Sequence, residues 1–239
     1  MPSKLNGFDR QLTWNDYPTK QGTPPRAGQQ ATAASTSSGM QNTGLQFVGS
    51  NGRFTLVDNL TVQITFTRAQ SFVMNWALAK GSPFPDDLLH HEQGHFTVSA
   101  LISRDFFADI MLLKEQTFAS VGAGNSAVQS ITNNTVDKMQ AVQDLYDAEV
   151  HPEQDNGLSR GPKQKEWDGY FDAAVMRYRP FMVPQSEWED SRNHGYAEPD
   201  DRRVGRITPM KIDFKRVGAD YLPVCERLID ILRAAGKTV

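Results

Sequence analysis

Three of the five histidines in this chain lie close together, at positions 90, 91 and 95. The last two enclose a glutamate in the segment His91-Glu92-Gln93-Gly94-His95, which has the pattern H-E-x-x-H. Residues four apart on an α-helix lie about 5–6 Å from each other on one face, so two imidazoles at this spacing can bind one Zn²⁺. Glu92 is then expected to act as the general base toward a water at the metal. The pattern therefore predicts a zinc-dependent hydrolase centre.

The pattern is specific enough to support a hypothesis. Multiplying the residue frequencies of this chain gives a chance expectation of about 0.4% for H-E-x-x-H anywhere in the sequence. Polar residues on a strongly apolar helix are also costly unless they are paired or bound. The competing interpretation is a hydrogen-bonded pair of core histidines beside a solvated glutamate. His90 lies one step off the ligand face, so we expect it to support the site or to lie on the surface.

A catalytic zinc ion normally takes three protein ligands and a water. Asp147 and His151 are four apart near the end of a second predicted helix, and both would face the first helix if the two pack antiparallel. We expect His151 to be the third ligand, with Asp147 either orienting an imidazole or replacing His151. His194, in a polar loop, is a further alternative. The candidate groups for stabilising an oxyanion are the hydroxyls of Tyr146 and Tyr196.

Extended elements are predicted before the motif. Apolar and polar residues alternate over residues 60–66, which predicts a strand with one buried face. Asn51-Gly52 between two apolar runs predicts a hairpin of residues 45–49 and 53–58. Together these segments predict a small antiparallel sheet over about residues 45–68, to which a strand-like piece at 12–14 could be added.

The segment from residue 18 to residue 44 is rich in Thr, Gly, Gln, Ala, Ser and Pro. This composition predicts a flexible excursion for most of it. The Ala/Thr run at residues 31–36 could nevertheless add an edge strand.

Helical spacing of apolar residues follows the strands, and strands followed by helices indicate an α+β fold. The first predicted helix carries the motif, and its apolar residues cover more than one stripe, which is typical of a central helix. We expect Gly122-Ala123-Gly124-Asn125 to precede the second helix and Pro152 to end it. The predicted helices span residues 88–113, 126 or 135 to 150, 164–177 and 221–235, with Gly236 as the stop of the last.

Charge and composition exclude several classes of protein. The 25 Lys and Arg residues against 28 Asp and Glu residues give a net charge of −3, which argues against a nucleic-acid-binding protein. No apolar run approaches the 18 or so residues of a membrane span. Cys225 is the single cysteine, so an intrachain disulfide and a cysteine metal cluster are excluded. Because the N-terminus lacks the apolar run of a signal peptide, we expect a cytoplasmic chain or an exported one whose leader has been removed.

The segment LLHHEQGHF, residues 88–96, resembles the active helix of a bacterial family of predicted secreted zinc-dependent proteases, otherwise a domain of unknown function. Members carry an HEQxHF helix, then Tyr-Asp with a nearby His-Gly, then Gln-x-x-Trp. Here the corresponding segments are Tyr146-Asp147, Asn156-Gly157-Leu158 and Gln164-Lys165-Glu166-Trp167, while Leu12-Thr13-Trp14 and Trp76 are similar before the helix. The chain departs from the family at Thr97 and Ala100, where acidic residues are usual, and at Asn156, which precedes the glycine.

The resemblance covers residues 10–178 and implies a zincin-like metalloprotease domain over residues 1–178. Residues 179–239 would form a C-terminal extension that ends in an amphipathic helix. It also implies Zn²⁺ as the cofactor and a protein or peptide as the substrate. Two alternatives stay open: a non-catalytic, zinc-stabilised binding or structural domain derived from a metalloprotease fold, and a metal-dependent hydrolase acting on something other than peptide. Retention of Glu92 favours a hydrolase, because a structural zinc site is normally closed by a fourth protein ligand.

Overall fold

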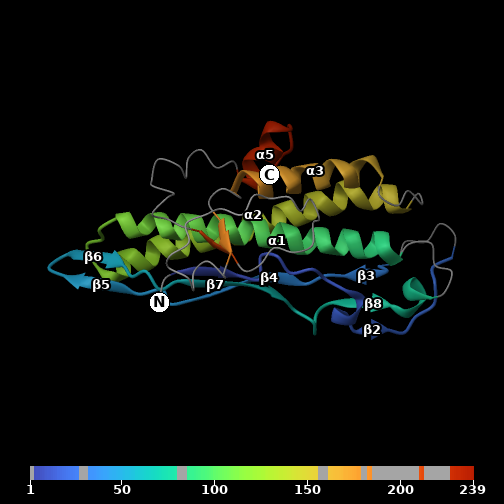
Figure 1. Ribbon diagram of the computed structural model, residues 1–239, viewed down its shortest axis with the longest axis horizontal. Coiled ribbons are helices and arrows are strands. Elements are labelled where there is room, and N and C mark those ends of the chain that lie inside the picture. Colours follow the sequence, from blue (N-terminus) through green and yellow to red (C-terminus); the bar gives the residue numbers. More distant parts are fainter. Residues whose placement is uncertain are drawn as a thin grey trace.

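A computed structural model describes residues 3–26, 32–79, 85–155, 161–178, 182–184, 210–212 and 227–239. The fold is α+β, as the sequence predicts, and its elements lie in layers (Figure 1). The long helices α1 (Pro85–Leu112) and α2 (Val121–Asp155) form the middle layer. Strands lie along one side of these helices, and α3 (Pro162–Tyr178) and α5 (Leu228–Ala234) lie on the other.

The sheet next to α1 has three strands in the order β1-β7-β4. Its central strand β7 (Thr61–Phe66) is parallel to β1 (Lys4–Asn6) and antiparallel to β4 (Ser38–Thr43). The alternation that predicts β7 is confirmed, because Val62 and Ile64 are buried. The predicted antiparallel sheet over residues 45–68 is wrong, since the partners of β7 come from earlier in the chain and one of them is parallel.

The remaining strands form three small sheets. One has the order β2-β8-β3, from β2 (Thr19–Lys20), β8 (Phe72–Met74) and β3 (Ala34–Ser35). Another is the predicted hairpin, which is confirmed as β5 (Phe47–Ser50) and β6 (Arg53–Leu56). Asn51 and Gly52 both have positive φ, as a tight hairpin turn requires. The third sheet pairs β9 (Met182–Pro184) with β10 (Met210–Ile212).

The predicted flexible excursion over residues 18–44 is wrong in its described part, which contains β2, β3 and β4. Strand β4 pairs with β7 from Ser38 to Thr43, although its side chains are only partly buried or exposed. Main-chain hydrogen bonds hold it, and a Ser-, Gly- and Gln-rich composition does not prevent them. The edge strand expected at residues 31–36 is confirmed in part by β3, which lies at the edge of its sheet.

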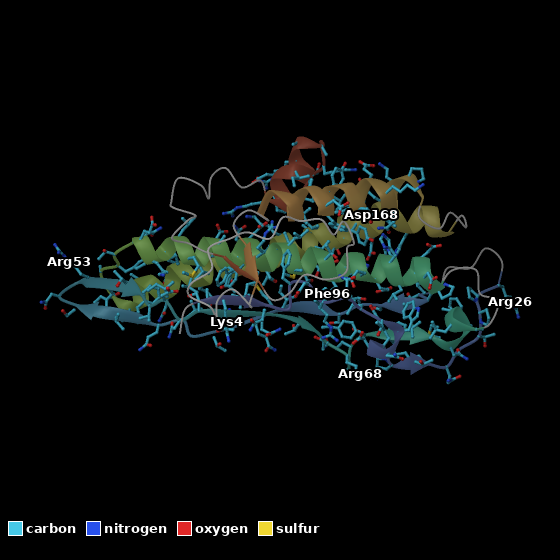
Figure 2. The ribbon with its side chains drawn as sticks, viewed as in Figure 1. Lys4, Arg26, Arg53, Arg68, Phe96 and Asp168 are labelled. Carbon is cyan, nitrogen blue, oxygen red and sulfur yellow. The ribbon has the colours of Figure 1, made fainter. Side chains whose placement is uncertain are left out.

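Helix α1 begins at Pro85 and carries Asp86 and Asp87 in its first turn, as the charge preference of a helix N-terminus favours. It contacts β4 and β7 on one side and α2 and α3 on the others. This position explains why apolar residues are spread around its circumference. The side chains fill the space between the layers (Figure 2), and Phe96 of α1 is buried there.

Helix α2 is longer than the sequence predicts at both ends. It runs through Gly124, where a Cβ would come within 2.6 Å of the Phe47 ring. A residue type that usually breaks helices is therefore used here for close packing against the hairpin. Pro152 also lies inside α2, in the last turn, and the helix ends at Asp155.

The other helices agree with their predictions where the structure describes them. Helix α3 covers the predicted segment, and α5 ends before Gly236, which has positive φ. Residues 221–226 of the last predicted helix lie outside the described residues, as does Cys225. The strand-like piece at 12–14 is wrong, because Trp14–Asp16 forms a short 3-10 helix. Among the described helices, none has both the length and the apolar character needed to cross a bilayer.

The described end of the C-terminal extension packs on the rest of the chain. Arg227 Nη1 donates to Asp109 Oδ2 of α1 at 2.8 Å. Lys237 Nζ donates to Glu149 Oε1 of α2 at 2.7 Å, and α5 contacts α3. Residues 227–239 are therefore part of the same packed unit as the helices that precede them.

The turn that leads out of β4 provides a test of this architecture. Gly44 has a φ of 83°, and a Cβ there would overlap the Asn59 carbonyl oxygen. We expect Gly44→Ala to lower the free energy of unfolding by about 1–3 kcal/mol. Gly39→Ala is the matched control in β4, because its Cβ would meet nothing within 4 Å. Urea unfolding measures both, and equal stability of the two variants would contradict the described path of β4.

Candidate metal site

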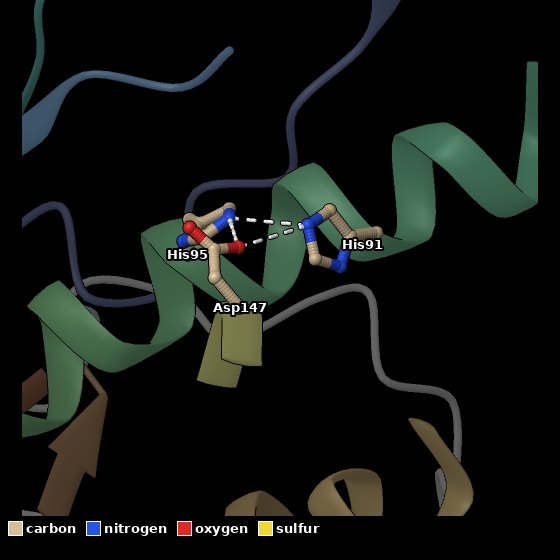
Figure 3. A group of neighbouring side chains, drawn as sticks. All are labelled: His91, His95 and Asp147. Carbon is tan, nitrogen blue, oxygen red and sulfur yellow. Dashed lines mark hydrogen bonds and ion pairs between the residues drawn. The ribbon is translucent and has the colours of Figure 1, made fainter. Parts of the chain in front are cut away.

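The site is built by the contact between α1 and α2. His91 and His95 lie one turn apart in the N-terminal half of α1. His91 faces Asp147 and His95 faces Gln143, so the residue numbers of the two helices run in opposite directions and the helices are antiparallel. Figure 3 shows the result: the two rings and the Asp147 carboxylate converge on one point.

Three donor atoms define this point. His91 Nε2 and His95 Nε2 are 3.2 Å apart, and Asp147 Oδ1 is 3.4 Å from the first and 3.0 Å from the second. Ligand atoms around a tetrahedral zinc ion with bonds of 2.0–2.1 Å are separated by about 3.3–3.4 Å. Asp147 Oδ1 is buried yet makes no hydrogen bond of ordinary geometry. The described residues thus place two imidazoles and a carboxylate where they could hold one small cation.

The electrostatics of two of these groups suit a cation. His91 is 1% exposed, and burial lowers the pKa of its imidazole to about 4, so the ring is neutral near pH 7. Burial by itself would raise the pKa of Asp147, but the neighbouring His91 and His95 rings hold it below its ordinary value. A neutral imidazole and a carboxylate anion are both electron-pair donors to a metal.

His95 behaves differently because two carboxylates act on it. Burial by itself would lower the pKa of His95, but Asp147 and Glu92 outweigh that effect and raise the pKa above its ordinary value. A positive charge is therefore favoured at this point between the helices. A bound cation would supply that charge in place of the proton.

Glu92 is 2% exposed and bonds to Thr36, the residue that follows β3. Burial raises the pKa of its carboxyl group, although His95 and hydrogen bonds with Thr36 oppose the shift. Its Oε2 atom is buried and has no hydrogen-bond partner in the described part of the chain. The Thr36 hydroxyl lies 2.6 Å from the hydroxyl of Tyr17. A carboxylate with one unpartnered oxygen in a dry environment has an increased affinity for a proton.

Tyr146, a candidate for oxyanion stabilisation, lies beneath the His91 ring. It is fully buried and stacks on His91, with ring centroids 4.9 Å apart and an interplanar angle of 14°. Its hydroxyl donates to Gln164 Oε1 at 2.9 Å. Tyr146 is therefore a platform that holds the His91 ring, and its hydroxyl is already used.

The Gln-x-x-Trp segment of α3 buttresses this platform. Gln164 Nε2 donates to Asp168 Oδ1 at 3.0 Å, and the same oxygen lies 2.9 Å from His90 Nε2. Trp167 is fully buried against Tyr146 and donates from Nε1 to Glu149 Oε2 at 2.9 Å. His90 thus belongs to the contact between α1 and α3, outside the three-atom group.

His151, the expected third ligand, lies beside the group. Its Nε2 is 3.3 Å from Asp147 Oδ1, and its side chain is 52% exposed. Asp147 contacts both motif histidines, so the geometry favours Asp147 as the third donor and leaves His151 as a neighbour on the solvent side. His194, Tyr196 and Asn156-Gly157-Leu158 lie outside the described residues.

Two residues that contact the site were missing from the sequence-based predictions. Gln143 bonds to His95, and its spacing of four residues from Asp147 would have placed it on the same face of α2. Thr36 bonds to Glu92 from the end of the run at residues 31–36, where an edge strand but no contact with the motif was expected. The first had a signal in the helical spacing, whereas the second depends on tertiary packing alone.

Comparisons of the chain with protein-family models, with curated proteins and with solved structures give no match. The interpretation of the site therefore depends on its own geometry and chemistry. The resemblance of residues 88–96 to an active helix stays a hypothesis that experiments on this site can test.

Gly94 lets Tyr146 approach α1, and this contact can be tested. A Cβ at position 94 would overlap the Tyr146 hydroxyl. We expect Gly94→Ala to destabilise the fold by about 1–3 kcal/mol and to weaken metal binding, because the platform under His91 must shift. Gly169→Ala, in α3, is the matched control: its Cβ would meet nothing within 4 Å, so alanine should add up to about 1 kcal/mol of stability. A Gly94→Ala variant as stable as the Gly169→Ala variant would contradict the contact.

The choice of third ligand can be tested by zinc titration in competition with a chelator. We expect Asp147→Ala to lower zinc affinity by more than about 100-fold, since it removes a donor that contacts both histidines. His151→Ala should cost less than about 10-fold, and Gln140→Ala, the control at an exposed position of α2, should leave affinity unchanged. A larger loss for His151→Ala than for Asp147→Ala would make His151 the ligand.

Proposed function

We propose that this chain is a zinc-dependent metallopeptidase of the H-E-x-x-H type with a zincin-like architecture. The observation that carries the proposal is the convergence of His91 Nε2, His95 Nε2 and Asp147 Oδ1 within 3.0–3.4 Å of one another, together with a buried Glu92 carboxylate that acts electrostatically on His95. Among the described residues Asp147 Oδ1 makes no hydrogen bond of ordinary geometry, and the three atoms are separated by distances close to those between ligands of one small cation. A metal ion is the simplest partner for such a set.

The donor chemistry supports zinc in particular. Two imidazoles and one carboxylate are a known ligand set of catalytic zinc, which keeps a fourth position for water or substrate. When bound, zinc would polarise the scissile carbonyl group and lower the pKa of a water in the site. His91, His95 and Asp147 would hold it.

Glu92 is the proposed general base. Its unpartnered Oε2 and its burial favour uptake of a proton, and its raised pKa brings it closer to the range in which a carboxylate exchanges protons efficiently. It would take a proton from the attacking water and deliver it to the leaving amine. Thr36 would fix the orientation of the carboxylate through its hydrogen bonds.

Access to the site supports a hydrolase. The side chains of Asp147 and His151 are 40% and 52% exposed, whereas that of His91 is 2% exposed. The side chains of Asp147 and His151 are therefore partly exposed on one side of the donor set, although the Asp147 Oδ1 atom itself is buried, and the core closes the other side. We propose that a substrate approaches from the Asp147 and His151 side.

A peptide is the proposed substrate on two grounds. The first is the resemblance of residues 88–96 to the active helix of predicted zinc-dependent proteases. The second is that β4 is a terminal strand of its sheet and contacts α1. An extended peptide could add to the edge of such a strand through main-chain hydrogen bonds.

One observation favours a second candidate function, a non-catalytic zinc-stabilised domain. His151 Nε2 lies 3.3 Å from Asp147 Oδ1, so a small movement of His151 would offer a fourth protein donor. A site closed by four protein ligands stabilises a fold without catalysis. This candidate gives no role to the unpartnered Glu92 carboxylate, which is why we place it second.

Glu92→Gln separates the two functions. If Glu92 is the base, the variant should bind one zinc ion with affinity within about threefold of wild type but cleave casein about 10²–10⁴-fold more slowly. Glu115→Gln, at an exposed position after α1, is the matched control and should cleave like wild type. Bound zinc with no casein cleavage in wild type would support the structural site, and wild type that binds no zinc would contradict both functions.

A further inference from the structure

We infer that Gln143 is a positioning residue that fixes the tautomer of His95, so that the Nε2 lone pair of this ring points at the metal site. The inference deepens the proposed function, since it concerns how one proposed ligand is prepared for a cation. It rests on hydrogen bonds of the protein itself, which can be tested without activity.

The orientation of the Gln143 amide is determined by the main chain. Its Nε2 lies 2.9 Å from the carbonyl oxygen of His95 and 3.2 Å from Ser99 Oγ. A carbonyl oxygen can only accept a hydrogen bond, so the NH₂ group of the amide must be on this side. The amide oxygen is thereby directed toward the His95 ring.

The orientation of the amide then determines the proton on the ring. Gln143 Oε1 lies 2.6 Å from His95 Nδ1, and an amide oxygen is only an acceptor. His95 Nδ1 must therefore carry a hydrogen. In the neutral ring this leaves Nε2 without a proton, as metal ligation requires, and Nε2 is the atom that lies 3.0 Å from Asp147 Oδ1.

Besides its two bonds to His95, the Gln143 amide also contacts a hydroxyl group on the sheet side. Ser99, which is fully buried in α1, contacts both Gln143 Nε2 and, at 2.8 Å, the hydroxyl of Ser38 at the start of β4. Gln143 thus bonds to the ring of His95, to the main chain of His95 and to a hydroxyl anchored on the sheet. One side chain fixes both where His95 lies and which nitrogen it presents.

Among the described residues, His91 has no comparable support. Its Nδ1 is buried and has no hydrogen-bond partner there, and the ring is held by stacking on Tyr146. The two ligands are therefore prepared differently: His95 by a hydrogen bond that selects one tautomer, and His91 by packing. Loss of the Gln143 acceptor should therefore lower metal affinity. Removing the hydrogen-bond partner of a metal ligand typically lowers affinity by about 10–100-fold.

The test uses the full chain in four forms: wild type, Gln143→Leu, Gln143→Glu and Ser99→Ala. Leucine has a similar size but no acceptor, whereas glutamate keeps an acceptor for the Nδ1 proton. Ser99→Ala removes the hydroxyl contact of the amide and leaves its contact with the His95 ring. Nitrogen NMR of ¹⁵N-histidine-labelled, metal-free protein at alkaline pH reports the tautomer of His95, and titration with zinc in competition with a chelator reports affinity.

We expect the Nδ1–H tautomer of His95 in wild type, in Gln143→Glu and in Ser99→Ala, and loss of this preference in Gln143→Leu. Zinc affinity should fall about 10–100-fold in Gln143→Leu, stay within about threefold in Ser99→Ala and be largely restored in Gln143→Glu. A general packing defect would weaken the Leu and Glu variants alike, which would overturn the inference.

The Nε2–H tautomer of His95 in wild type would also overturn it, as would wild-type zinc affinity in Gln143→Leu. If Gln143→Leu does not fold, the spectra of wild type and Gln143→Glu are the test. The Nδ1–H tautomer of His95 in both would support the inference, and the Nε2–H tautomer would contradict it. If wild type shows the Nδ1–H tautomer but binds no zinc, the proposed function fails while the role of Gln143 stands.

Discussion

The site depends on the antiparallel contact between α1 and α2. His91 and His95 come from one face of the first helix, and Gln143, Tyr146 and Asp147 come from one face of the second. Each set is produced by helical spacing alone, but only the packing of the helices brings the two together. The close approach requires a glycine inside the motif, because any side chain at position 94 would occupy the space of the Tyr146 hydroxyl.

This contact concentrates polar groups where a helical interface would normally be apolar. Three buried atoms have no hydrogen-bond partner among the residues that the structure describes: His91 Nδ1, Glu92 Oε2 and Asp147 Oδ1. Burying them costs free energy that packing elsewhere must offset. Such conflicts between local chemistry and stability are expected where a site is built for a ligand. A cation would relieve part of the conflict, so its binding would also stabilise the fold.

Local features of the sequence were predictable, and features set by tertiary contact were not. The β5–β6 hairpin and the alternation of β7 are local patterns, and both are confirmed. Strand β4 was missed because main-chain hydrogen bonds with β7 hold it, and amino-acid composition does not predict such bonds. The start of α2 was missed because Gly124 is there to receive the Phe47 ring. Likewise, helical spacing predicted that Asp147 and His151 both lie near the motif. Only the packing of α1 against α2 shows that Asp147 contacts both motif histidines and that His151 lies beside it.

The described C-terminal part of the chain is also held by contacts that are distant in sequence. Trp167, which packs under Tyr146, donates to Glu149, and Glu149 also accepts from Lys237 near the C-terminus. A chain of contacts therefore joins the last residues of the protein to the platform of His91. Because an interior transmits displacement through close-packed neighbours, the described C-terminal residues act as support for the site. The domain boundary at residue 178 stays a prediction from the extent of the resemblance, and contacts of the described C-terminal residues with α2 and α3 cross it.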